Sequence, residues 1–278
     1  MTDPVVRVSD TWLALREPAD AVARARELVD YLERDPGGWV IHDLGGGTGA
    51  MGRWLAPRLC GPQHWVIHDR DEDLLACAGV EPPGPAADGA AVIVAARRSD
   101  ITRLQPRELA DATLITASAL LDMLTEAELA SVIAACVGAG CPVLLTLSVV
   151  GRVDITPPEL LDRRVAAAFN AHQRRTTERG RLLGPGAVAF AVEEFGRHGS
   201  EVLVRPSPWR LGPEQADLTA EWFKGWVGAA GEQEPDLARE IDAYTYRRLA
   251  QLSTGQLTAT VDHADLLVRP DERSSPGR

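Results

Sequence analysis

The chain lacks features that whole classes of proteins require. It has 278 residues, only four cysteines, a single lysine, and no apolar run near the roughly 20 residues of a membrane helix. The cysteines (Cys60, Cys77, Cys136 and Cys141) fit neither a C-x-x-C metal site nor a disulfide framework. The N-terminus has no basic start followed by an apolar run. We therefore expect reduced thiols, no membrane span, no secretory signal and a cytoplasmic location.

Positive charge is also scarce. The formal net charge is −11, and all but one of the basic residues are arginines. Nucleic-acid binding usually calls for a basic surface, because it gains from the counterions released at the phosphate backbone. The charge balance therefore argues against a nucleic-acid partner. Hydrophobic residues at 45% and charged residues at 25% are ordinary for a globular protein.

What the sequence does contain is a helical start followed by an alternating α/β pattern. Apolar residues at helical spacing predict a helix over residues 9–34, which ends at the Asp-Pro-Gly-Gly sequence of 35–38. We expect residues 1–38 to form an N-terminal helical cap. The main domain is predicted over residues 39–268, and residues 269–278 form a polar tail.

From residue 39, short apolar runs alternate with helical stretches, which is typical of βαβ units around a parallel sheet. Helices are predicted at 48–59, 71–78, 125–137, 213–229 and 235–252, the third with a capping box of Thr125 and Glu128. Gly151 to Pro158 are predicted to close the fifth strand, and a helical insertion follows in the segment of about 151–198. The predicted strands cover residues 39–44, 64–68, 91–96, 112–117, 142–149, 201–205 and 257–268.

A glycine-rich turn lies between the first predicted strand and its helix. Gly45, Gly46, Gly47 and Gly49 follow the strand that ends in Asp43-Leu44. Glycines permit positive φ and remove the Cβ atoms that would hold a ligand away from the backbone. The helix that follows presents free amide donors at its N-terminus. A nucleotide or nucleoside site is therefore predicted at this turn.

Two kinds of ligand fit such a turn. Residues 47–52 match the G-x-G-x-x-G pattern of dinucleotide sites, with Asp69 about 20 residues further on. Against this, Asp43 would repel a pyrophosphate but would suit an ammonium group. Acids also follow successive strands at Asp43, Asp69 and Asp100. Ligands of open α/β sheets bind at the carboxyl ends of the strands. The predicted site therefore presents acidic side chains where a pyrophosphate would need hydrogen-bond donors.

The run from Asp43 to Gly49 resembles motif I of the class I, or Rossmann-like, S-adenosylmethionine-dependent methyltransferases. The sequences at 66–69, 99–101 and 114–122 are similar to the second, third and fourth elements of the same family. The resemblance implies a seven-stranded α/β sandwich, a mostly parallel sheet with an antiparallel last strand. Gly46 is an additional glycine, and the absence of an N-P-P-Y type sequence after the fourth strand puts methylation of a nucleic-acid base in doubt.

The resemblance also implies a cofactor, S-adenosylmethionine, and roles for individual residues. Asp43 and the four glycines would orient its methionine end, and Asp69 would bind the ribose. Asp100 and Ile101 would hold the adenine, and Ser118 would lie beside the sulfonium. Arg70, next to Asp69, completes the predicted cofactor-binding set. No metal site is predicted.

The implied reaction is in-line displacement of the methyl group onto a heteroatom of a small, soluble metabolite. His172, in the polar insertion, is the candidate general base, because histidine exchanges protons near neutral pH; its alternative is a solvated helix position. Trp209, Trp222 and Trp226 form either a packed core or homodimer contact, or an aromatic wall over an organic substrate. An NAD-dependent oxidoreductase and a catalytically silent S-adenosylmethionine-binding module remain the alternative functions.

Overall fold

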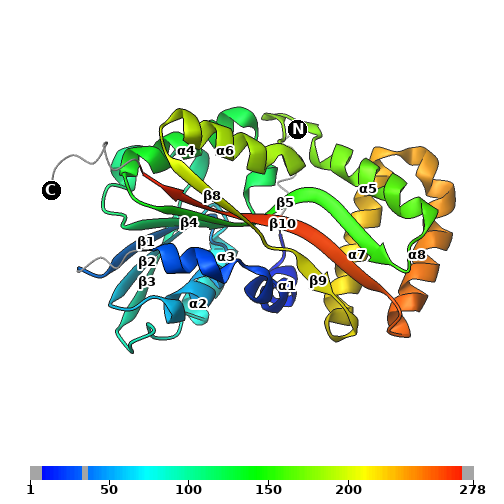
Figure 1. Ribbon diagram of the computed structural model, residues 1–278, viewed down its shortest axis with the longest axis horizontal. Coiled ribbons are helices and arrows are strands. Elements are labelled where there is room, and N and C mark those ends of the chain that lie inside the picture. Colours follow the sequence, from blue (N-terminus) through cyan, green and yellow to red (C-terminus); the bar gives the residue numbers. More distant parts are fainter. Residues whose placement is uncertain (1–7, 33–36, 271–278) are drawn as a thin grey trace.

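A sheet of eight strands runs along the length of the molecule (Figure 1). The computed structural model describes residues 8–32 and 37–270. The strands lie in the order β3-β2-β1-β4-β5-β10-β8, and β9 pairs with the outer half of β10. The strands are β1 (Trp39–Leu44), β2 (Gln63–Asp69), β3 (Val92–Arg98), β4 (Leu114–Ser118), β5 (Val143–Thr156), β8 (Glu201–Pro206), β9 (Trp209–Leu211) and β10 (Thr258–Arg269).

The first five strands are parallel, and β10 is antiparallel to β5, β8 and β9. The predicted α/β architecture, with a mostly parallel sheet and an antiparallel last strand, is confirmed. β9 is an additional strand that the sequence did not predict, because three residues carry too short a pattern. A separate two-stranded sheet joins β6 (Thr176–Thr177) to β7 (Gly180–Arg181).

The predicted end of the fifth strand was wrong. β5 does not stop at residue 149 but continues through Gly151, which has a φ of +80°, to Thr156. Beyond Ser148 its residues change from uniformly buried to alternately exposed and half-buried, because the strand leaves the centre of the sheet. The outer half of β10 follows it, and a register shift between Val261 and His263 marks the place where the pair bends.

The helices fall into two groups. On the flanks of the sheet lie α2 and α3 near β1 to β3, and α4 and α6 on the opposite side (Figure 1). At the far end α5, α7 and α8 pack together, with β9 and the outer halves of β5 and β10, into a second lobe. The helices are α1 (Asp10–Ala23), α2 (Ala50–Leu55), α3 (Glu72–Val80), α4 (Glu126–Ala139), α5 (Leu160–Gln173), α6 (Ala187–Arg197), α7 (Ala216–Gln233) and α8 (Ala238–Ser253).

The helix predicted over 9–34 is shorter than expected. α1 ends at Ala23, Arg24 has extended backbone angles, and a 3-10 helix covers Arg26–Tyr31. The break occurs because the Ala25 amide donates to the buried Asp265 carboxylate (2.8 Å) instead of continuing the helix. The predicted stop at 35–36 and the tail from residue 271 lie outside the described residues. The predicted capping box of Thr125 and Glu128 is present at the start of α4.

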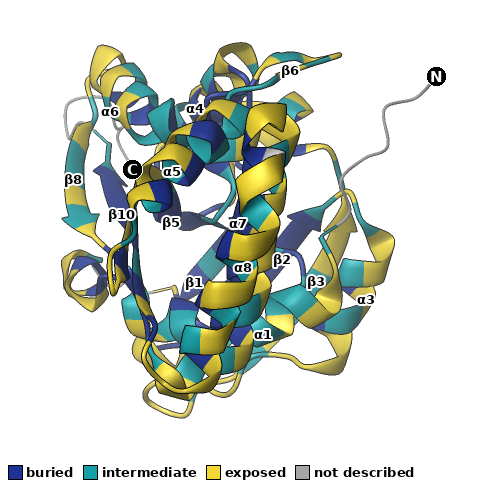
Figure 2. Ribbon diagram, turned by 90° about the vertical axis from the view of Figure 1, so that its right-hand side faces the viewer, coloured by how far each residue is buried: buried dark blue, intermediate teal, exposed yellow. Residues whose placement is uncertain are grey.

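Each lobe has its own apolar core. The sheet is covered by one cluster beneath α4 and α6 and by another beneath α2 and the 3-10 helix. The second lobe is filled by aromatic residues, including Trp209, Trp222, Phe223, Trp226 and Tyr244. Figure 2 views the molecule from this end: α8 is exposed along its outer side, whereas most of β10 is buried. Nowhere in residues 8–32 and 37–270 is a helix both long and apolar enough to cross a membrane.

Candidate active site at the strand ends

The glycine turn adopts the strained backbone for which glycine is suited. Gly45, Gly47 and Gly49 have φ values of +65°, +51° and +80°. Gly46 needs to be glycine for a different reason: a Cβ at this position would collide with Asp43 Oδ2. The additional glycine of the motif therefore makes room for the carboxylate of the preceding strand. At Gly47 a Cβ would make ordinary van der Waals contacts, the nearest with Leu13 of α1 at 3.6 Å, so the φ of Gly47 and not crowding accounts for the glycine.

Asp43, at the end of β1, is fully buried. Its Oδ1 accepts a hydrogen bond from Thr116 Oγ1 of β4 (2.7 Å), while Oδ2 has no partner within the described part of the chain. Burial raises the pKa of this carboxyl group to about 7, against the opposing effects of the Thr116 hydroxyl and the Arg24 charge. A cationic ligand group would stabilise the ionised form.

Asp69 ties the end of β2 to the glycine turn. Its Oδ2 accepts from the Gly47 amide (3.0 Å), and its Oδ1 accepts from the Asp71 amide (2.9 Å). The structure thus brings Asp43, the glycines and Asp69 together at the strand ends. Arg70, the next residue, is exposed.

Asp100 and Ile101 follow β3 in a short 3-10 turn. Asp100 is exposed and accepts from the amide and the hydroxyl of Thr102 (3.1 and 2.7 Å), while Ile101 is 9% exposed. The Asp100 carboxylate therefore caps its own turn. Both Thr102 donors use Oδ1, and Arg103 Nε lies 3.5 Å from Oδ2, so an adenine amino group would have to share Oδ1 with Thr102 or Oδ2 with Arg103.

A series of polar side-chain contacts lies next to the turn that contains Asp100. His68 Nδ1 lies 2.9 Å from Ser99 Oγ, His68 Nε2 lies 2.9 Å from His42 Nδ1, and His42 Nε2 lies 3.1 Å from Asp111 Oδ1. Burial lowers the pKa of both rings, that of His68 to about 4, so both are neutral at pH 7. These contacts link the ends of β1 and β2 to the residue before Asp100.

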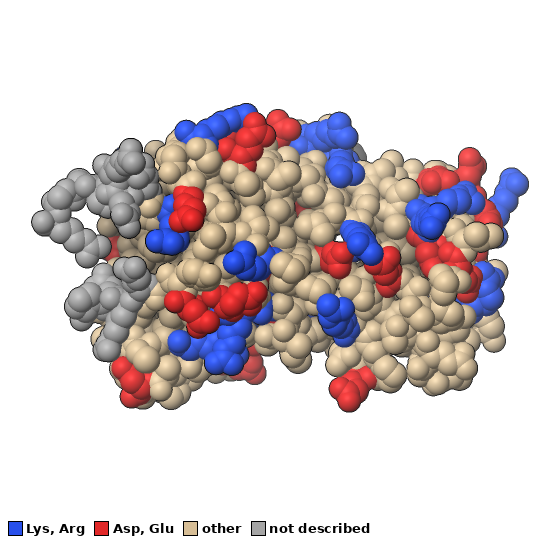
Figure 3. Space-filling model, in the orientation of Figure 1, with Lys and Arg blue, Asp and Glu red and all other residues tan. Residues whose placement is uncertain are grey.

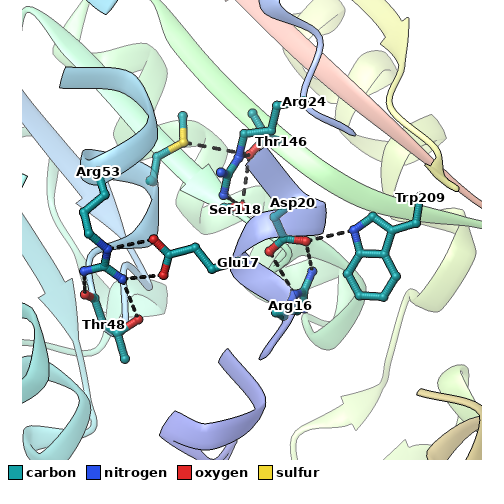
Figure 4. A network of polar contacts seen from close by, with 10 residues as sticks. Arg16, Glu17, Asp20, Arg24, Thr48, Arg53, Ser118, Thr146 and Trp209 are labelled. Atoms are coloured by element: carbon teal, nitrogen blue, oxygen red, sulfur yellow. Dashed lines mark hydrogen bonds and ion pairs between the residues drawn. The ribbon is translucent and has the colours of Figure 1, made fainter. Parts of the chain in front are cut away.

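Ser118, at the end of β4, contacts a residue that the sequence did not single out. The Arg24 Nη2 atom donates to Ser118 Oγ (3.1 Å), and Thr146 Oγ1 donates to the same oxygen (3.0 Å). Arg24 follows α1 and points toward Ser118 and Thr146 (Figure 4). It is 4% exposed, and its guanidinium lies over the Trp54 ring (5.3 Å). Sequence periodicity placed Arg24 inside a continuous helix and carried no signal for this position.

Asp122 lies four residues beyond Ser118, in the loop that follows β4. It is half-buried, and Gln173 Nε2 of α5 is 3.4 Å from its Oδ2. Burial raises the pKa of Asp122 to about 6, with the charge of Arg16 acting against the increase. Ala119 in the same loop has a φ of +52°, a strained conformation for a residue with a side chain. The only sequence signal for Asp122 was its place at the end of the segment 114–122, which resembles the family's fourth strand and the loop that follows it.

α1 lies across these strand ends and is fixed on both sides (Figure 4). On one side Glu17 forms a two-point ion pair with Arg53 of α2 (2.7 and 2.6 Å), and Arg53 also donates to the Thr48 carbonyl of the glycine turn. On the other side Asp20 accepts from Arg16 and from the Trp209 indole (both 2.9 Å). The helix therefore joins the glycine turn to the second lobe.

His172 and the tryptophans lie further out. His172, near the end of α5, has its Nε2 3.2 Å from Glu232 of α7, and its role as a base stays a prediction.

Trp222 and Trp226 stack with ring centres 5.5 Å apart, and both belong to the core of the second lobe. They also line a pocket of about 460 Å³ together with Trp12 and Phe169. Both interpretations of the tryptophans therefore have structural support. In the described residues no group of three or more His, Cys, Asp and Glu is placed to hold a metal ion.

Several solved structures are similar to this chain. A cyclopropane synthase from Mycobacterium tuberculosis is 15% identical with a TM-score of 0.50, over 94% of this chain and 95% of that one. An S-adenosylmethionine-dependent methyltransferase from Methanosarcina mazei is 12% identical with a TM-score of 0.47, over 87% and 96%. One from Geobacter sulfurreducens, in complex with S-adenosyl-L-homocysteine, is 15% identical with a TM-score of 0.40, over 97% and 95%.

No family model matches the chain, and no curated protein matches it in sequence. At identities this low a likeness shows the fold alone. The strand order, together with the cyclopropane synthase comparison, shows that the chain has the class I, Rossmann-like methyltransferase fold. The fold implied by the sequence resemblance is thereby confirmed.

Proposed function

We propose that the chain transfers the methyl group of S-adenosylmethionine to a heteroatom of a small, soluble metabolite. The observation that carries this proposal is Asp43, a fully buried carboxyl group with an unpartnered oxygen directly beneath a glycine turn. A cofactor that ends in an ammonium group would stabilise this carboxylate. The pyrophosphate of a dinucleotide would be repelled by it, which argues against the oxidoreductase alternative.

The residues at the strand ends fit such a cofactor. Asp43 would face the ammonium group, and the glycine turn would lie along the methionine chain. Asp69 would bind the ribose, and Asp100 with Ile101 would hold the adenine. When bound, S-adenosylmethionine supplies an electrophilic methyl group for in-line displacement, so orientation by these residues would account for much of the acceleration.

Asp122 is the group that we propose receives the proton of the acceptor. A carboxyl group with a pKa of about 6 is largely ionised at pH 7, and it is basic enough to take a proton as the new bond to the methyl carbon forms. The proton of the acceptor heteroatom would pass to Asp122 while the bond from sulfur to the methyl carbon breaks. His172 remains the alternative base from the sequence, and paired variants separate the two.

A small acceptor is supported by what surrounds the strand ends. α1 crosses them and is anchored to both lobes, so a bulky duplex would have to displace a helix held by an ion pair to Arg53 and by a hydrogen bond from Trp209. Acidic and basic side chains are interspersed on the face shown in Figure 3, and the net charge is −11. Neither feature suits a phosphate backbone. We accordingly propose that the acceptor is not nucleic acid.

The test is to incubate the protein with methyl-labelled S-adenosylmethionine and a small-molecule extract, and then to identify the labelled product. Asp122→Asn is expected to lower the rate by about 10²–10⁴-fold without changing the affinity for S-adenosylhomocysteine. His172→Gln is the matched comparison and is expected to keep most of the rate. Cofactor binding with no labelled product would favour the catalytically silent module, and a rate loss confined to His172→Gln would move the base to that residue.

A further inference from the structure

The side chain of Arg24 is buried without a complete set of partners. Its Nε lies 3.4 Å from Thr146 Oγ1 and its Nη2 donates to Ser118, but Nη1 is buried with no partner in the described part of the chain. Both partners are neutral hydroxyl groups. A buried guanidinium that is neither paired nor fully hydrogen-bonded costs free energy, which an anionic ligand would recover.

No carboxylate of the described residues forms an ion pair with Arg24. Asp20, Asp265 and Asp43 act on it only through longer-range charge, and burial outweighs them, so the pKa of Arg24 is lowered. Its direct contacts therefore leave the positive charge uncompensated. Arg16 and Arg53 differ from it, because each donates from both Nε and Nη2 to the two oxygens of one carboxylate.

Arg24 lies close enough to Asp43 for one amino-acid ligand to contact both side chains. β1 and β4 are neighbours, with Asp43 in register with Thr116, so Ser118 is two residues further along the adjacent strand end. Arg24 contacts Ser118, and its charge reaches Asp43. A cation without an ion-pair partner and a carboxylate with one unpartnered oxygen thus lie at the ends of adjacent strands. A ligand that carries a carboxylate and an ammonium group on one carbon is complementary to this pair.

We infer that Arg24 binds the carboxylate of the methionine moiety of S-adenosylmethionine. The inference rests on the cofactor of the proposed function and adds a binding residue from outside the sheet. Arg24 is held in place for this role by the Ala25 amide, which donates to Asp265, and by the Trp54 ring beneath the guanidinium. The segment that follows α1 thereby becomes part of the cofactor site.

The experiment compares S-adenosylmethionine with decarboxylated S-adenosylmethionine, which lacks only the carboxylate, by titration calorimetry. The wild-type protein is expected to prefer the carboxylate-bearing compound by about 10–100-fold, the range for a charge-assisted hydrogen bond. In Arg24→Gln the preference is expected to fall to about one, through weaker binding of S-adenosylmethionine alone. Arg24→Lys keeps the charge but loses the planar geometry, and an intermediate ratio is expected.

Arg58→Gln is the matched control, because Arg58 also lies over the Trp54 ring (4.7 Å) but is exposed. It should keep the wild-type ratio. The melting temperature of ligand-free Arg24→Gln should equal or exceed that of the wild type, whereas a purely structural arginine would lower it. An undiminished ratio in both Arg24 variants would overturn the inference and leave the cofactor proposal intact. Failure of the wild type to bind either compound would overturn both.

Discussion

The buried carboxyl group of Asp43 lowers the stability of the ligand-free protein when it ionises. The carboxyl group is fully buried and one oxygen is unpartnered, which is why its pKa is about 7 instead of 3.8. Between these two pH values the folded protein holds the proton more tightly than the unfolded chain. The stability that Asp43 contributes at pH 4 is therefore lost as the pH rises through 7. A bound ammonium group would reverse this loss.

Asp43→Asn should stabilise the ligand-free protein in alkaline solution. Asparagine keeps an acceptor for the Thr116 hydroxyl and has no charge to bury, so the free energy of unfolding at pH 8 should rise by up to about 4 kcal/mol. At pH 4 the variant and the wild type should be similar. Urea unfolding at both pH values measures the difference. A variant that is less stable than the wild type at pH 8 would show that the buried carboxylate is already compensated.

At the scale of elements, α1 is the segment that closes the strand ends. Its ion pair of Glu17 and Arg53 is partly buried and reaches the glycine turn through the Thr48 carbonyl. Its C-terminal end is fixed by Asp265, which also accepts from the Leu147 amide and the Ser207 hydroxyl. Cofactor binding and the position of α1 should therefore depend on each other.

Glu17→Gln should make α1 more mobile and weaken cofactor binding. Without the ion pair, α1 loses its link to α2, so amide exchange along α1 should become faster. Arg53 would also hold the Thr48 carbonyl of the glycine turn less firmly, so the affinity for S-adenosylhomocysteine should fall several-fold. Hydrogen exchange with and without the ligand, read by mass spectrometry, checks both effects. Glu72→Gln removes the exposed pair with Arg98 and should change neither. Equal effects from the two variants would contradict a specific role for α1.

The strands around the cofactor site were predictable, because each is a short apolar run that ends in a polar or glycine-containing turn. Other elements depend on contacts between distant residues. Helical periodicity continued past Ala23, where the buried Asp265, 240 residues away from Ala25, interrupts the helix. Gly151 was interpreted as a strand end, but pairing with β10 carries the strand through it.

The same limit applies to the site residues. Asp43, Asp69 and the glycines lie close together in the sequence pattern and in space, so motif spacing found them. Arg24 and Asp122 acquire their chemistry from burial, which no local pattern records. A guanidinium without an ion-pair partner can be recognised only when every neighbour is known. The sequence therefore indicated the glycine turn and the acids of the candidate site but not the buried residues that complete it.

At the scale of the whole molecule, two lobes share β5 and β10 and meet at the strand ends (Figure 1). One lobe contributes the glycine turn and the acids. The other is joined to it by α1, through the bond of Trp209 to Asp20. We propose that this junction binds S-adenosylmethionine and not a dinucleotide.

Titration calorimetry with S-adenosylhomocysteine and NADH, on the wild type and on Asp69→Ala, separates the two ligands. Asp69 accepts a hydrogen bond from the Gly47 amide and is the proposed ribose ligand, so its replacement should remove both contacts while the two cores remain. We expect the wild type to bind S-adenosylhomocysteine at one site and to leave NADH unbound. Asp69→Ala should show no measurable binding and still unfold cooperatively. Binding of NADH by the wild type, or unchanged affinity in Asp69→Ala, would contradict the assignment.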